Sequence, residues 1–149
     1  MTKPGTFVSI RLADGSLAYG VALEPPYFAF YELRTEMPLD DLQKIEAAPV
    51  LFKQAVRFSG TRKWKRIQLT GVVAEPVVRY SQDLLDYQQC VIFDSLGNER
   101  EASAEECVGI EHAAVWEAHA IEKRLLDTFM GRVNAEEVRS RVRFGPSTP

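Results

Sequence analysis

The side chains that could act as nucleophiles, bases or metal ligands in this sequence are few and widely spaced. The chain has two cysteines, Cys90 and Cys107, and two histidines, His112 and His119. No CxxC, HExxH, GxSxG, P-loop or GxGxxG motif occurs, so the spacings that metal, nucleophile and phosphate sites require are missing. We expect two reduced cysteines packed as small apolar residues and two structural or surface histidines on one helix face. The sequence predicts no metal and no cofactor.

Catalysis could still arise from residues that meet only in the folded chain. One further hypothesis is an enzyme whose site contains Cys90 or the histidines, because residues of a catalytic triad need not be close in sequence. The adjacent acids Asp40-Asp41 and Glu105-Glu106 are expected to face solvent rather than to form a general acid and base pair. We therefore predict a protein that is not an enzyme.

Four cations around one tryptophan are the strongest functional signal that the residues carry by themselves. They form the run Arg62, Lys63, Trp64, Lys65 and Arg66. Tryptophan can stack on a base while the cations hold phosphate, so a nucleic-acid-binding small β-barrel module is the alternative reading. We favour a structural role in which Trp64 closes one end of the core. The net charge of −3 argues against a general nucleic-acid binder.

The clearest element that could position such residues is a β-hairpin over residues 6–23. Asp14-Gly15 favours a two-residue type I′ turn between two apolar runs. This loop length predicts one apolar face and one face of polar or small residues. The apolar pairs of that register are Leu12 with Leu17, Ile10 with Tyr19, and Val8 with Val21.

The order of the remaining elements predicts an α+β fold. Short strands come first, and the longest helical segment, residues 111–130, comes late, with Gly131 as its C-cap. We expect a strongly bent antiparallel sheet, with closure into a partial barrel left open, and the late helix packed on it. The other expected elements are strands at 27–33, 49–58, 64–73, 76–80 and 89–93, a short helix at 38–45, a Ser103-Glu106 capping box, and a short helix at 134–142 capped by Asn134.

Length and composition fit one cytosolic domain. The 149 residues fit a single domain over 1–145 and a flexible tail at 146–149. We expect no signal peptide and no membrane partner, because the sequence has no apolar h-region behind its first residues and no apolar run of spanning length. The oligomeric state stays open. Charge is uneven: residues 47–74 hold six cations and no acid, whereas residues 32–46 and 99–111 are acidic.

Two stretches of the chain together resemble the immunity protein 26 family of bacterial polymorphic toxin systems. The first runs from Lys3-Pro4-Gly5 through the hairpin to Leu23, and the second runs from Leu51-Phe52 to Lys63-Trp64-Lys65-Arg66-Ile67. The resemblance covers about residues 3–70. It implies a cytosolic protein that binds and blocks a cognate toxin without catalysis or cofactor. It also implies that six residues are scaffold residues: Gly5, Asp14, Gly15, Tyr19, Gly20 and Trp64.

The toxin-contacting surface does not follow from the resemblance, because it differs among members of the family. Our hypothesis is an acidic surface, since basic nucleases are common among such toxins and complementary charge speeds capture. The residues proposed for it are Asp40, Asp41, Glu99, Glu101, Glu105 and Glu106.

Overall fold

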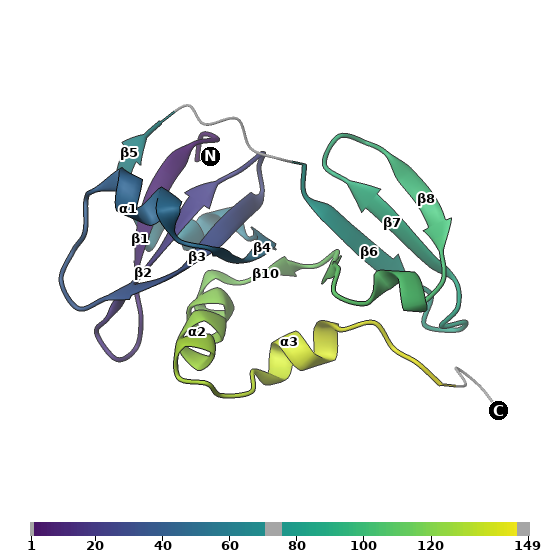
Figure 1. Ribbon diagram of the computed structural model, residues 1–149. Helices are drawn as coiled ribbons and strands as arrows, with labels where there is room; N and C mark the ends of the chain where they lie inside the picture. Colours follow the sequence, from purple (N-terminus) through teal and green to yellow (C-terminus); the bar gives the residue numbers. More distant parts are fainter. Residues whose placement is uncertain (1, 71–75, 146–149) are drawn as a thin grey trace.

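The computed structural model describes residues 2–70 and 76–145, and within these ranges the chain builds two separate β-sheets (Figure 1). The first sheet has six strands, in the spatial order β10 (Val115–Trp116), β4 (Val50–Val56), β3 (Tyr27–Thr35), β2 (Leu17–Ala22), β1 (Thr6–Arg11) and β5 (Lys65–Leu69). The second has four, in the order β8 (Glu99–Ala102), β7 (Cys90–Asp94), β6 (Val78–Gln82) and β9 (Glu111–His112).

One short segment, residues 111–116, belongs to both sheets. Its β9 part pairs in parallel with β6, and its β10 part pairs in parallel with β4. All other strand pairs are antiparallel. The fold is therefore α+β, as expected, but the described residues form two mixed sheets rather than one bent sheet, and they form no barrel. The sheets are linked by two short edge strands in parallel pairs. Parallel pairs join residues far apart in sequence, so local turn signals do not predict them.

The N-terminal hairpin forms at the expected place with a register one residue away from the prediction. Arg11 pairs with Leu17 and Val8 pairs with Gly20. Leu12 N–H donates to the Ser16 carbonyl and Gly15 N–H donates back to the Leu12 carbonyl, so the loop has three residues. Gly15 adopts a φ of +86°, which suits the left-handed position that closes such a loop.

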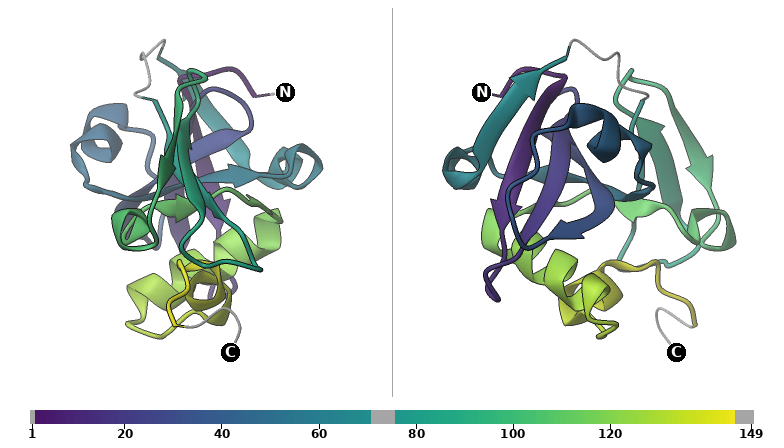
Figure 2. Two further views of the ribbon diagram at one scale, coloured as in Figure 1. Left: turned by 90° about the vertical axis from the view of Figure 1, so that its right-hand side faces the viewer. Right: turned by 60° about the vertical axis from the view of Figure 1, so that its left-hand side comes forward.

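This register makes both faces of the first sheet apolar. One face carries Val8, Ile10 and Phe30 in the core that packs against α2 (Ala118–Phe129). The other carries Phe7, Tyr19 and Val21 in a second core. Figure 2 shows α1 (Leu42–Ala47) and α2 on different sides of this sheet. The expected polar face does not exist, because a helix covers each side.

The late helix is shorter than predicted. Residues 111–116, which the helical pattern included, form the two bridging strands, and α2 begins at Ala118. Its end agrees with the prediction: Gly131 has φ +69°, and Arg132 N–H donates to the Asp127 carbonyl in a Schellman cap. Edge pairing with β4 and β6 therefore overrides helical periodicity at the start, and local capping decides the end.

The remaining helices are single turns or little more. Asp41 caps α1 and Asn134 caps α3 (Ala135–Ser140), each through a side-chain oxygen that accepts from a backbone N–H. Ser103 and Glu106 form the expected capping box around the 3₁₀ turn η2 (Glu105–Cys107). A second 3₁₀ helix, η1 (Phe58–Lys63), precedes β5. In the described ranges, no helix has the length and apolar content needed to cross a lipid bilayer. The tail predicted at 146–149 and the part of the predicted 64–73 strand beyond residue 70 lie outside the described residues.

Candidate functional site

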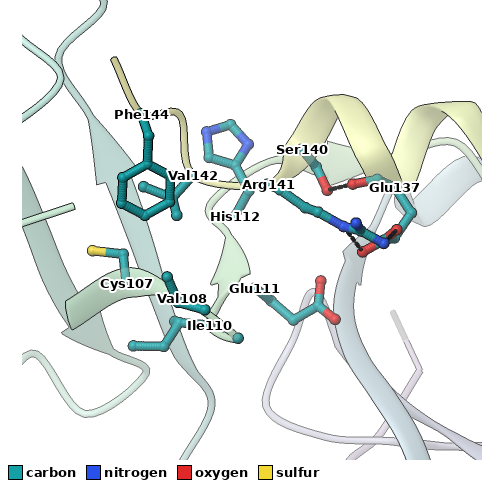
Figure 3. A pocket seen from close by; sticks show the side chains of 11 residues that line it. Cys107, Val108, Ile110, Glu111, His112, Glu137, Ser140, Arg141, Val142 and Phe144 are labelled. Atoms are coloured by element: carbon teal, nitrogen blue, oxygen red, sulfur yellow. Dashed lines mark hydrogen bonds and ion pairs between the residues drawn. The ribbon is translucent and has the colours of Figure 1, made fainter. Parts of the chain in front are cut away.

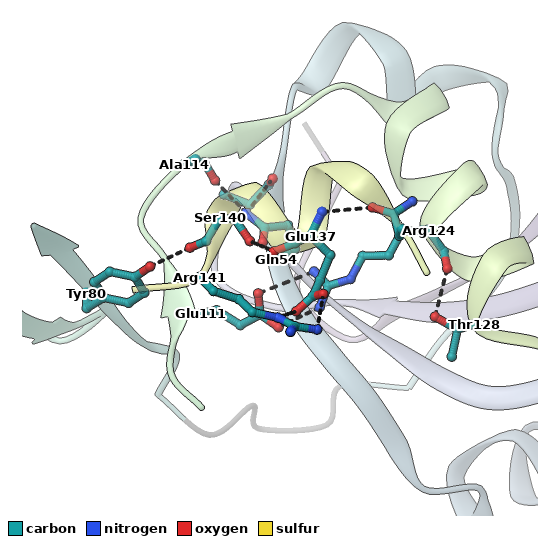
Figure 4. A network of polar contacts seen from close by, with 11 residues as sticks. Gln54, Tyr80, Glu111, Ala114, Arg124, Thr128, Glu137, Ser140 and Arg141 are labelled. Atoms are coloured by element: carbon teal, nitrogen blue, oxygen red, sulfur yellow. Dashed lines mark hydrogen bonds and ion pairs between the residues drawn. The ribbon is translucent and has the colours of Figure 1, made fainter. Parts of the chain in front are cut away.

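A network of polar contacts ties the two sheets and the C-terminal helices together (Figure 4). Buried Gln54, on β4, donates through Nε2 to the Ala114 carbonyl between β9 and β10 at 2.5 Å. Arg124, on α2, donates two hydrogen bonds to the Glu111 carboxylate on β9, at 2.9 and 3.3 Å. Side chains of the first sheet and its covering helix therefore hold the segment that carries the edge of the second sheet.

Arg124 is almost completely buried, with 7% of its surface exposed. Its guanidinium carbon lies 3.7 Å from the centre of the Phe52 ring and 5.2 Å from that of Trp116. The ion pair with Glu111 and the two aromatic faces together offset the cost of burying this charge. The helical periodicity of this segment rests on its apolar residues alone, so no local pattern singles out Arg124.

The C-terminal segment is bound to β6 through two side chains. The Tyr80 hydroxyl donates to the carbonyl of Ser140. The Gln82 amide donates to the Arg143 carbonyl and accepts from the Arg143 N–H, at 2.9 Å in both cases. The segment is thereby held beside the second sheet, where Val142 packs on the small core around Tyr80 and Ile92.

Between η2 and α3 lies a cavity of about 360 Å³ (Figure 3). One end is apolar, with Val108, Ile110, Val142 and Phe144, and the other end is polar. At the polar end the carboxylate of Glu137 accepts two hydrogen bonds from Arg141, at 3.0 and 2.7 Å. These charged groups therefore neutralise each other.

The titratable groups of this cavity are not poised for nucleophilic catalysis. Burial, with a contribution from nearby Cys90, raises the pKa of the Cys107 thiol to about 11, so no reactive thiolate forms near neutral pH. Burial, and then the positive charge of Arg143, lowers the pKa of His112, which packs 5.2 Å from the Tyr80 ring centre. The imidazole is thus neutral near pH 7.

The other predicted chemical residues lie apart from this cavity's polar end. Cys90 is buried in β7 and its thiol donates to the Tyr87 carbonyl, which agrees with the expected packed cysteine. His119 is exposed on α2 while His112 is in strand β9, so the expected shared helix face was wrong. Within residues 2–70 and 76–145, no three His, Cys, Asp or Glu side chains are grouped as metal ligands.

The basic run does not form a base-stacking platform. Trp64 is 2% exposed, packs edge-on against the rings of Phe28 and Phe30, and donates through Nε1 to Glu122 at 2.9 Å. The structural role favoured for Trp64 is confirmed. The four cations lie around it, where Lys63 pairs with Glu122, Arg66 donates to Thr2, Arg62 lies over the Phe58 ring and Lys65 is exposed.

The six acidic residues of the hypothesis occupy two places. Asp40 and Asp41 are exposed at the start of α1, beside the first sheet. The four glutamates lie on β8 and η2, at the outer edge of the second sheet (Figure 1). Glu106 is engaged with Arg100 at 2.6 Å and with Ser103. The structure therefore leaves the two aspartates apart from the glutamates. It also places Glu106 with Arg100 on the core side of β8, whereas Glu99 and Glu101 point to the opposite face.

The face of the second sheet opposite its small core is only partly covered. Two cross-strand rows make up this open face: Arg79, Phe93 and Glu99, and Ser81, Val91 and Glu101. Glu99 and Glu101 thus share a face with Arg79, which was not among the predicted site residues. The only signal was one cation within the apolar run Val77-Val78-Arg79-Tyr80.

The residues expected to form the scaffold have roles in holding the backbone. The Tyr19 hydroxyl lies 2.6 Å from the Thr35 hydroxyl and accepts from Leu39 N–H at 3.0 Å. A Cβ at Gly20 would lie 2.9 Å from the Ala29 carbonyl oxygen, so the strands admit only glycine there. Hydrogen bonds from Ser16, and then from Arg34, lower the pKa of Asp14 to about 2.

Comparison with known protein families finds a match. No curated protein and no solved structure matches the chain. A family profile described as immunity protein 26 matches residues 3–91, which extends past the expected 3–70 into β7. Because this match covers more than half of the 149 residues, the chain belongs to the immunity protein 26 family.

Proposed function

We propose that this chain neutralises a cognate toxin domain by binding it as a folded protein, without catalysis. The observation that carries the proposal is its membership of the immunity protein 26 family, which implies toxin neutralisation. The raised pKa of Cys107 and the mutual pairing of Glu137 with Arg141 support a binding role, because neither group is free to do chemistry near neutral pH.

We further propose that the toxin is basic and contacts the acidic side of the second sheet. Residues 76–112 contain eight acidic residues against two arginines, whereas residues 2–70 contain seven acidic residues against ten lysines and arginines. Glu99 and Glu101 project from β8 on the open face, and η2, which carries Glu105 and Glu106, packs on the core side of the same edge strand. Opposite charge on the partner would speed encounter and orient docking.

Asp40 and Asp41 are left out of this proposed contact, because they lie beside α1 on the other sheet. They offer a comparison of the same charge at a different place. Asp41 also caps α1, so Asp40 and the exposed Glu36 make the better matched pair.

The test uses the C-terminal toxin domain that we expect a gene beside that of this chain to encode. The purified proteins should form a 1:1 complex in gel filtration, and one equivalent of this chain should abolish toxin activity. The variant Glu99→Lys/Glu101→Lys should associate at least ~10-fold more slowly at low salt, whereas Glu36→Lys/Asp40→Lys should not. Absence of a complex would reject the function, and equal rates for both variants would reject the surface.

A further inference from the structure

Arg79 is held between two aromatic rings where the sheets meet. Its guanidinium carbon lies 4.5 Å from the centre of the Tyr27 ring on β3 and 4.7 Å from that of Phe93 on β7. The two rings come from different sheets. Contact with both rings restricts the orientations that the planar guanidinium can take.

Two polar atoms of this arrangement have no hydrogen-bond partner among the described residues. In the part of the chain that the structure describes, Arg79 Nε and the Tyr27 hydroxyl are both buried and make no hydrogen bond. Tyr27 is 4% exposed. No carboxylate of the described residues lies within ion-pair distance of Arg79, and burial lowers the pKa of its guanidinium. Buried groups of this kind normally have partners, because leaving them unpaired is costly.

A cavity of about 250 Å³ opens beside these two groups. Its lining includes Tyr27, Arg79, Pro26, Ser95, Ala114 and Glu24. A water molecule takes up about 30 Å³ in the liquid, so the cavity has room for an acidic side chain. Among the described residues, Glu24 is exposed and lines the cavity, so its carboxylate is a competitor for Arg79. Glu111 pairs with Arg79 across the β6 and β9 strands, but its carboxylate is held by Arg124.

We propose that Arg79 and Tyr27 form a receptor for one carboxylate side chain, an aspartate or glutamate, of the toxin. This inference rests on the proposed function. The guanidinium presents a fork of N–H donors that matches a carboxylate, and the Tyr27 hydroxyl adds a further donor. Because Arg79, Phe93 and Glu99 form one row, a partner that presents an acid to Arg79 and a cation to Glu99 would dock in a single register.

The carboxylate receptor can be tested without the toxin. We would titrate the ¹⁵N-labelled full chain with N-acetyl-glutamate methylamide and follow the Nε–Hε signals of its arginines by NMR. The Arg79 signal should shift saturably, with half-saturation on the order of 10 mM. The neutral N-acetyl-glutamine methylamide should leave it unmoved, and the signal of exposed Arg100 serves as an internal control.

Two variants sharpen this titration. Tyr27→Phe keeps the ring and removes the hydroxyl, so half-saturation should require severalfold more ligand. Glu24→Gln removes the competing carboxylate and should leave binding equal or tighter. A linear Arg79 shift that matches the response to sodium chloride would overturn the receptor.

The toxin domain provides the second arm. Arg79→Gln and Arg79→Lys should both raise the dissociation constant at least ~10-fold, mainly through faster dissociation, and Glu24→Gln should not. Arg79→Lys keeps the charge and guards against misfolding as the cause, and circular dichroism checks the fold of each variant. If wild type and both Arg79 variants bind the toxin equally, the receptor fails while the proposed function stands. If the toxin binds none of them although the Arg79 signal saturates, the proposed function fails and the carboxylate site remains.

Discussion

Arg124 and Glu111 join the two sheets through a two-point hydrogen-bonded ion pair. The arginine comes from the helix that covers the first sheet, and the glutamate comes from the edge strand of the second. Their sequence separation is only 13 residues, yet the contact sets where β9 can lie relative to α2. Phe52 and Trp116 flank the guanidinium and exclude water from one side of it.

Arg124→Ala should lower the free energy of unfolding by about 3 kcal/mol, because it leaves Glu111 partly buried and removes packing on Phe52. Urea denaturation monitored by tryptophan fluorescence measures this loss. Exposed Arg139 on α3 provides the control, and Arg139→Ala should change stability by about 0.5 kcal/mol or less.

The same pair tests whether the chain unfolds as one unit. We propose that residues 1–145 form a single domain, so fluorescence and circular dichroism should report one coincident transition. In Arg124→Ala the transition should move and stay single. Two separate transitions in the wild type would instead show that the sheets unfold independently.

Trp64→Ala should destabilise the fold by about 4 kcal/mol, because it removes a buried ring and its bond to Glu122. Lys65→Ala, at the exposed neighbour, should have almost no effect on stability. Thermal unfolding compares the two. Binding of short single-stranded RNA by the wild type, weakened by Lys65→Ala, would instead support the hypothesis that this basic segment binds nucleic acid.

Gly20→Ala should cost about 2 kcal/mol, because the added Cβ would meet the Ala29 carbonyl at 2.9 Å and the Phe30 ring at 3.1 Å. Chemical denaturation measures the change. Gly15→Asn, in the open hairpin loop, should cost about 1 kcal/mol or less, since asparagine tolerates left-handed backbone and nothing lies near the new Cβ. A cost at Gly15 equal to that at Gly20 would contradict the packing argument.

Stability should fall as the pH rises from 9 to 12. Burial raises the pKa of Tyr80 to about 12 and that of Cys107 to about 11, above their ordinary values of 10.0 and 9.0. The folded state therefore holds both protons more tightly than the unfolded state, so their stabilisation is complete below pH 9 and is lost above it.

For Tyr80 the loss between pH 10 and 12 should reach about 2 kcal/mol. Tyr80→Phe also loses the bond to the Ser140 carbonyl, so its stability at neutral pH is lower, but its curve should be flatter above pH 10. Cys107→Ala should flatten the curve between pH 9 and 11. Unchanged slopes in both variants would show that other groups govern the alkaline transition.

Local sequence accounts for the elements whose signals are short in range. Asp14-Gly15 places the hairpin, Asn134 caps α3 and Gly131 ends α2, because each acts through backbone groups within a few residues of itself. The burial of Trp64 was also predictable, since an indole ring rarely stays exposed in a strand-rich core. The family resemblance followed from the same N-terminal stretch.

Contacts between distant residues decided the rest. The hairpin register, one residue away from that expected, depends on helices covering both faces of the sheet, and the two-strand bridge at 111–116 depends on free edges of β4 and β6. A local sequence pattern reveals neither a free strand edge nor a helix that packs on a sheet face. The rings that enclose Arg79 come from β3 and β7, so this candidate carboxylate receptor exists only once the sheets meet. Short-range backbone chemistry thus determined the turns and helix caps. Long-range packing determined the strand register, the start of α2 and which side chains became a site.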